Sequence, residues 1–106
     1  MHLIIDIETS QNLIDSSLVV PELEMGAEAC GATVLQSFSH SFGERSGYTA
    51  FIMLAESHIS IHTWPELNYA ALDVFMCGAC NPHKIFSTVE KLFGTRYEIR
   101  EIERPV

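Results

Sequence analysis

The sequence predicts an α+β fold, a two-layer sandwich in which two helices pack on one face of an antiparallel β-sheet. Short apolar runs rich in β-branched and aromatic residues alternate with two segments whose apolar residues repeat at helical spacing. The order β-α-β-β-β-α-β, with short hairpins, favours this arrangement over a doubly wound sheet. With 106 residues, we expect a single domain, residues 1–106, with a thin core.

The first third of the chain predicts one strand and one helix. Leu3–Ile7 is a short apolar run with β-branched residues and predicts the strand, whereas residues 9–17 predict an irregular loop. Pro21 can open the helix, acidic residues follow in its first turn, and Gly31 can end it. One face of this helix is formed by Leu23, Gly26, Ala27 and Cys30.

The middle of the chain predicts a sheet. Residues 32–40 and Tyr48–Leu54 predict strands, and the glycines and charges of residues 42–47 predict a flexible connection between them. Ser57–His62 alternates polar and apolar side chains within the same strand-like region. Tyr69–Cys77 predicts a further apolar strand, which is interrupted by an aspartate.

The C-terminal third predicts the second helix and a last strand. Asn81 is a candidate N-cap, Pro82 fits the first helical position, and Gly94 can end the helix. We expect Arg96–Ile102 to form a polar strand at the edge of the sheet. The core-facing stripe of the helix comprises Ile85, Phe86, Val89, Leu92 and Phe93.

Charge and composition exclude several classes of partner. The formal net charge of −8, from 14 acidic and 6 basic residues, repels phosphate backbones, so we expect no nucleic-acid partner. No apolar run approaches the roughly 20 residues that span a bilayer, and Met1–Asp6 contains no secretory leader, so we expect no membrane association. Three cysteines argue against a disulfide framework and favour a cytoplasmic location. A hydrophobic content of 47% is high for a small lone domain and favours an oligomer.

The segment from Ala55 to Glu66 combines a hydroxyl, two imidazoles and a carboxylate inside an apolar region. The hydroxyl of Ser57 can attack the carbonyl of Glu56 and form an ester by an N-to-O acyl shift. That shift requires a strained backbone, an oxyanion stabiliser and a proton shuttle. Elimination of the ester would leave dehydroalanine, and hydrolysis would then give a pyruvoyl group at a new N-terminus.

Two further residues are candidates for this chemistry. The imidazole of His62 can accept and donate a proton, so it is the candidate proton shuttle. Thr49, on the preceding strand, can offer a hydroxyl to the oxyanion. From the residues alone, a second interpretation stays open: the serine and histidines only satisfy each other's hydrogen bonds within a sheet.

Residues 55–66, followed by residues 69–78, resemble the signature of the small prokaryotic S-adenosylmethionine decarboxylases, a pyruvoyl-dependent family of proenzymes. Weaker similarity extends over most of the chain. The resemblance implies that Ser57 becomes the pyruvoyl group. Cleavage between residues 56 and 57 would then give a β chain of residues 1–56 and an α chain of residues 57–106.

The resemblance also implies roles for the candidate residues. His62 would assist processing, Thr49 matches a hydroxyl position of the family, and Cys77 matches the proton donor. Glu66 matches the acid that binds the ribose hydroxyls of the substrate. Phe42 and Trp64 are candidates for an aromatic wall around the sulfonium and adenine, because cations and flat rings both favour aromatic faces.

The implied reaction starts with a Schiff base between the α-amine of S-adenosylmethionine and the pyruvoyl carbonyl. Loss of carbon dioxide and protonation would give decarboxylated S-adenosylmethionine, the aminopropyl donor for spermidine biosynthesis. The family assembles its sites between two protomers, so we expect a homodimer with its sites at the interface.

Some residues depart from the family pattern. The loop from Phe42 to Ala50 is one residue longer than usual, and Asn68 stands where glycine is common. Both changes fall near the expected nucleobase pocket. A pyruvoyl-dependent arginine or ornithine decarboxylase therefore remains an alternative, because Glu44 in the changed loop suits a small basic substrate.

Two alternatives of other classes also stay open. Cys77 and Cys80 form a CxxC pair, which together with His58 and His62 offers four ligands of the kind that bind zinc. Since the resemblance assigns Cys77 to catalysis, we expect no metal, and Cys80 has no assigned role. The second alternative is an unprocessed regulatory paralogue, which would not need intact serine, histidine and cysteine.

Overall fold

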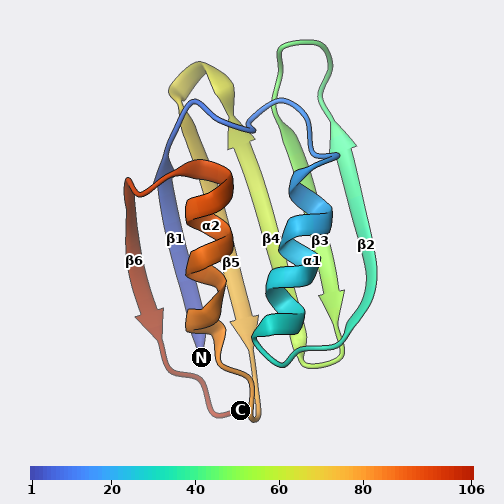
Figure 1. Cartoon of the computed structure of the whole chain (residues 1–106), viewed down its shortest axis with the longest axis vertical. Helices are drawn as coiled ribbons and strands as arrows, with labels where there is room; N and C mark the ends of the chain where they lie inside the picture. Colours follow the sequence, from blue (N-terminus) through green and yellow to red (C-terminus); the bar gives the residue numbers. More distant parts are fainter.

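The computed structural model describes residues 1–106 as a six-stranded sheet with two helices on one face (Figure 1). The strands are β1 (His2–Glu8), β2 (Val34–Ser41), β3 (Tyr48–Leu54), β4 (Ser57–Trp64), β5 (Tyr69–Met76) and β6 (Tyr97–Ile102). The helices are α1 (Val19–Ala29) and α2 (Phe86–Phe93), with short 3-10 turns η1 (Pro65–Leu67) and η2 (Pro82–Ile85). The strand order is β2-β3-β4-β5-β1-β6, and every neighbouring pair is antiparallel. The expected two-layer α+β sandwich is confirmed.

Three details differ from the sequence-based expectation. Four strands, not three, lie between the helices, because Ser57–Trp64 pairs with both β3 and β5 as a strand of its own. Helix α1 begins at Val19, two residues before Pro21. The first turn of a helix tolerates proline because its amide groups have no intrahelical acceptor. Asn81 caps η2 rather than α2, since its side chain accepts a hydrogen bond from the amide of His83 at 3.2 Å.

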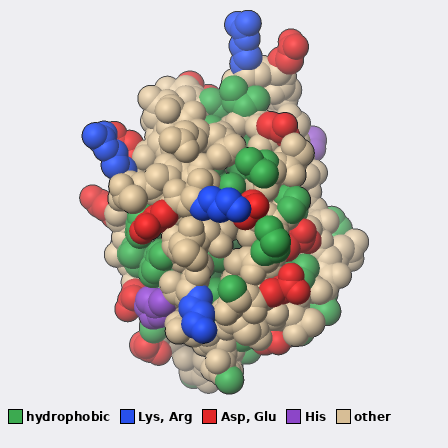
Figure 2. Space-filling view, viewed as in Figure 1, with side chains coloured by type: hydrophobic (Ala, Val, Ile, Leu, Met, Phe, Trp, Pro, Cys, Tyr) green, Lys and Arg blue, Asp and Glu red, His purple; other side chains and the backbone are tan.

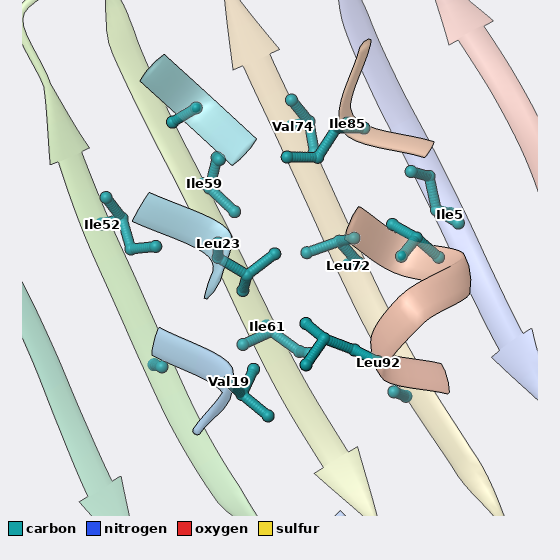
Figure 3. Packing of buried hydrophobic residues seen from close by; sticks show 14 of the residues in the cluster. Ile5, Val19, Leu23, Ile52, Ile59, Ile61, Leu72, Val74, Ile85 and Leu92 are labelled. Atoms are coloured by element: carbon teal, nitrogen blue, oxygen red, sulfur yellow. The ribbon is translucent and has the colours of Figure 1, made fainter. Parts of the chain in front are cut away.

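The core lies between the sheet and the helices. Alternate side chains of β1, β3, β4 and β5 are buried on the helix-facing side, so each strand contributes every second residue. Leu23 of α1 and Leu92 of α2 lie over the apolar residues of β4 and β5 (Figure 3). Full burial of one such side chain contributes about 1.5–3 kcal/mol. Gly94 ends α2 with a φ of 93°, as its position predicted.

The other face of the sheet, here called the open face, carries no helix (Figure 1). Apolar side chains on it are partly exposed, with Phe38 at 49% and Met53 at 38%. The helix-covered side shows acidic and basic side chains scattered among apolar ones (Figure 2). Strand β6 is an exposed edge strand, as predicted. None of the helices has the length and apolar character needed to cross a membrane.

Candidate active site

The Glu56–Ser57 peptide lies at the turn that joins β3 to β4. Ser57 has a φ of 154°, a backbone conformation that residues other than glycine rarely adopt. Holding a serine there costs on the order of 1–3 kcal/mol. The strained torsion is next to the candidate scissile bond, so breaking that bond would release the strain.

Two hydrogen bonds to Thr33 hold the turn in place. The Thr33 amide donates to Oε1 of Glu56 at 2.8 Å, and the Ala55 amide donates to the Thr33 carbonyl at 2.9 Å. The Glu56 side chain therefore anchors the turn to the segment before β2. This contact spans 23 residues of sequence, and no local pattern predicts it.

Cys77 follows β5 directly and lies beside the same turn, because Ser57 pairs with Met76 in the sheet. Its thiol donates a hydrogen bond to the Glu56 carbonyl oxygen, with Sγ and O 3.0 Å apart. This oxygen belongs to the candidate scissile peptide, and it would carry negative charge if Ser57 attacked the carbonyl. The structure thus brings the predicted residues Glu56, Ser57 and Cys77 together.

The remaining candidates gather around a cavity of about 360 Å³ at the other end of β4. Its walls include the side chains of Phe42, Thr49, His62, Trp64 and Glu66. Oγ1 of Thr49 and Nδ1 of His62 are hydrogen-bonded at 2.9 Å. The cavity volume lies within the range of small-molecule sites, and both aromatic and acidic groups line it.

A single chain does not bring these two clusters together. His62 is five residues beyond Ser57 on the extended strand β4. At a rise of ~3.3 Å per residue, the two residues are about 16 Å apart. The turn cluster of Glu56, Ser57 and Cys77 and the cavity cluster around His62 are therefore separate within one chain.

His58 lies on the open face between aromatic rings. Its imidazole stacks on Phe51 with centroids 5.3 Å apart, and Phe75 approaches edge-on at 5.9 Å. Partial burial lowers the pKa of His58 below its ordinary value, and the nearby His2 lowers it further. The lowered pKa favours the neutral form of the imidazole beside the turn cluster.

The zinc alternative finds no support in this arrangement. His58 and His62 are four residues apart on one strand, about 13 Å by the same rise. No group of three or more histidine, cysteine, aspartate or glutamate side chains is placed to hold a metal ion. The buried Cys30 has a pKa raised to about 11 by desolvation, and burial also raises the pKa of Cys80.

Two residues that shape the cavity were not singled out from the sequence. Thr63 is buried; its Oγ1 accepts from the Tyr48 amide at 2.9 Å and donates to the Leu13 carbonyl at 2.6 Å. Gly47 packs against it so closely that a Cβ would lie 2.1 Å from the Thr63 carbonyl oxygen. Only two features of the sequence could have pointed to these residues. Thr63 occupies an inward position in the alternation of β4, and position 47 is a glycine.

Asn68 has an explanation in its backbone. It ends the η1 turn in the left-handed conformation, with a φ of 50°. Asparagine and glycine both adopt this conformation readily. The residue therefore preserves the turn beside Trp64 and Glu66, although it departs from the expected glycine.

Comparisons with known proteins agree with this architecture. A family model described as S-adenosylmethionine decarboxylase matches residues 1–105. A relative from Methanococcus maripaludis (strain C5), named S-adenosylmethionine decarboxylase proenzyme, is 38% identical over 109 residues, covering 99% of this chain and 88% of the relative. A relative of the same name from Prochlorococcus marinus (strain MIT 9211) is 40% identical over 97 residues, covering 90% and 79%.

A solved structure is similar over nearly the whole chain. It is the crystal structure of the adenosylmethionine decarboxylase from Aquifex aeolicus VF5, with a TM-score of 0.80 and 29% identity, covering 99% of this chain and 89% of that one. Fold and sequence thus define an α+β protein of the decarboxylase proenzyme class. Within that class, the chain belongs to the S-adenosylmethionine decarboxylase family.

Proposed function

We propose that this chain is a self-processing S-adenosylmethionine decarboxylase that cleaves itself before Ser57 and acts as a homodimer. Family membership supports the reaction class. The observation that carries the self-processing is the hydrogen bond from the Cys77 thiol to the carbonyl oxygen of Glu56. It prepares that oxygen for negative charge next to a strained serine.

The first covalent step is attack of the Ser57 Oγ on the Glu56 carbonyl carbon. The hydroxyl proton leaves to a base, and the carbonyl oxygen takes the charge opposite the Cys77 thiol. The C–N bond then breaks, the nitrogen takes up a proton, and an ester joins Glu56 to Ser57. Relief of the backbone strain at Ser57 offsets part of the unfavourable energy of this shift.

The second step removes the α-proton of Ser57 and expels the Glu56 carboxylate. Water then hydrolyses the resulting dehydroalanine and releases ammonia. The products are fragment 1–56 with a free carboxylate and fragment 57–106 with an N-terminal pyruvoyl group. The chain thus makes its own cofactor, whose ketone takes up the substrate amine and accepts the electron pair freed when carbon dioxide leaves.

The remaining residues bind the substrate and move its proton. Glu66 would accept hydrogen bonds from ribose hydroxyls, and Phe42 and Trp64 would pack on the flat or cationic parts of the substrate. Cys77 would deliver a proton to the α-carbon, because its thiol already lies beside residue 57. The product is decarboxylated S-adenosylmethionine, the aminopropyl donor for spermidine biosynthesis.

A second copy of the chain would complete the site. The open face leaves Phe38 and Met53 partly exposed, and a partner sheet would cover them. A two-fold axis that places two open faces together with their strands antiparallel puts each turn cluster opposite the partner's cavity cluster. In that dimer, Ser57 and Cys77 of one chain would work with His62 and Thr49 of the partner subunit.

Complementation between two inactive variants tests this arrangement. A Ser57→Ala chain keeps His62, and a His62→Ala chain keeps Ser57. Each alone is expected to stay uncleaved. In a co-expressed heterodimer, one of the two sites contains both intact residues, so the His62→Ala chain is expected to be cleaved. His83→Ala serves as the control, because His83 lies on the exposed η2 turn and pairs with Glu101.

The readout is the fraction of cleaved chains on a denaturing gel. Absence of cleavage in the mixture would contradict a site shared between subunits, and unaided cleavage of His62→Ala would exclude His62 from processing. Carbon dioxide release from S-adenosylmethionine, arginine and ornithine, measured in parallel on the processed protein, identifies the substrate. Release from S-adenosylmethionine alone is the expected result.

A further inference from the structure

Tyr69 supports the cavity wall from outside the cavity. Tyr69 is the first residue of β5 and pairs with Trp64, the last residue of the neighbouring strand β4. The two rings are stacked, with centroids 5.4 Å apart and an interplanar angle of 24°. Trp64 lines the cavity, and Tyr69 covers one face of its indole, so the orientation of the indole depends on where Tyr69 is held.

Tyr69 is itself fixed by a carboxylate on the next strand. Its hydroxyl donates a hydrogen bond to Oδ1 of Asp6 in β1. Arg100 of β6 reaches Oδ2 of the same carboxylate at 3.4 Å. A continuous line of contacts therefore crosses the open face from β6 through β1 and β5 to Trp64. The hydrogen bond to Asp6 raises the pKa of Tyr69 to about 12, so the hydroxyl remains a donor throughout the neutral range.

We propose that Tyr69 and Asp6 are positioning residues for substrate binding, because they fix the Trp64 indole as the wall on which the sulfonium or adenine of the substrate packs. The inference rests on the proposed function. Neither residue is among those proposed to transfer a proton, and within one chain neither contacts the turn cluster, which lies at the opposite end of β4 and β5. Their loss should therefore weaken substrate binding and leave the chemical step unchanged.

The test uses Tyr69→Phe, which keeps the stacked ring and removes only the hydroxyl. In the processed enzyme, KM is expected to rise about three- to tenfold with kcat unchanged, the pattern of lost binding. Trp64 is the only tryptophan of the chain, so its fluorescence reports directly on the wall. Quenching by acrylamide is expected to increase in Tyr69→Phe, and added substrate is expected to protect the indole less.

A matched control is available on the other side of the sheet. Tyr97 also stacks on an aromatic ring and also donates its hydroxyl to a carboxylate, that of Glu90. Tyr97→Phe should alter neither KM nor the fluorescence of Trp64. Asp6→Asn is the second variant if Tyr69→Phe does not fold. It keeps an acceptor oxygen for the Tyr69 hydroxyl but loses the charge, so an intermediate rise in KM is expected.

Three outcomes separate the possibilities. A wild-type KM and unchanged quenching in Tyr69→Phe would overturn the inference. Equal effects of Tyr69→Phe and Tyr97→Phe would overturn it as well, because they would show a general loss of stability. If the wild-type protein does not decarboxylate S-adenosylmethionine, the proposed function fails, while the quenching comparison still decides whether Tyr69 positions Trp64.

Discussion

Replacing Thr63 with valine removes a buried hydroxyl while keeping nearly the same side-chain shape. In the native protein, this hydroxyl accepts from the Tyr48 amide and donates to the Leu13 carbonyl. All three residues are buried, so water does not easily replace the lost partner. Each orphaned buried group costs about 1–3 kcal/mol. Two groups lose their partner, so we expect Thr63→Val to lower the free energy of unfolding by about 2–6 kcal/mol.

The measurement needs a chain that stays in one piece. We would make the substitution in the Ser57→Ala background and follow unfolding in urea at fixed protein concentration. At about 4 °C per kcal/mol for a domain of this size, the expected loss corresponds to a decrease in Tm of about 8–24 °C. Thr63→Ser keeps the hydroxyl and should recover most of the stability.

Thr95→Val is the control, because Thr95 is exposed in the loop before β6. It should change stability by less than about 0.5 kcal/mol. If Thr63→Val were as stable as this control, the hydrogen bonds of Thr63 with Tyr48 and Leu13 would not stabilise the residues around the cavity. The account of how the cavity is built would then be wrong.

Further predictions concern catalysis, pH and the core. The Cys77→Ser variant should still be processed. It should turn over about 100-fold more slowly or protonate its product at the wrong position, because a hydroxyl is a poorer acid than a thiol. Unchanged turnover and an unchanged product would remove Cys77 from the mechanism. His58 faces His2, Asp73 and Arg104, and its pKa is lowered in the folded chain. The unfolded chain therefore binds more protons in mildly acidic solution. The free energy of unfolding should consequently fall as the pH drops below about 6.5, the ordinary pKa of histidine. Urea midpoints measured between neutral and mildly acidic pH should fall less steeply in His58→Gln, and an equally steep fall would exclude His58 as a source. Leu23→Ala should cost about 2–5 kcal/mol in urea unfolding, and a loss below 1 kcal/mol would mean that α1 does not pack as described.

The periodicity of the sequence was enough to predict the fold class and the faces of its elements. The inward residues of β1 and β5 are buried, and so is the predicted stripe of the second helix except for Phe86, which is partly buried. Burial on one face imposes a period that the sequence must follow. Helix ends were less predictable. Pro21 suggested a start for α1, but proline fits any position of the first turn, so it does not identify the first residue.

The candidate site was predictable in its residues but not in its geometry. Ser57 and His62 are close in sequence, and both were predicted to take part in processing. The extended strand β4 places them well apart, and in the proposed dimer the partner subunit brings a turn cluster and a cavity cluster together. The contacts of Glu56 with Thr33 and of Thr63 with Leu13 depend on how distant segments fold against each other, which local patterns do not encode.

The central claim is that the chain converts its own serine into the catalytic carbonyl, and intact mass spectrometry of the purified protein tests it most directly. The account predicts fragments 1–56 and 57–106, the second carrying a carbonyl and resistant to Edman degradation, and a single unbroken chain for Ser57→Ala. An active wild-type protein that consists only of the uncleaved chain with an ordinary serine at position 57 would contradict the account.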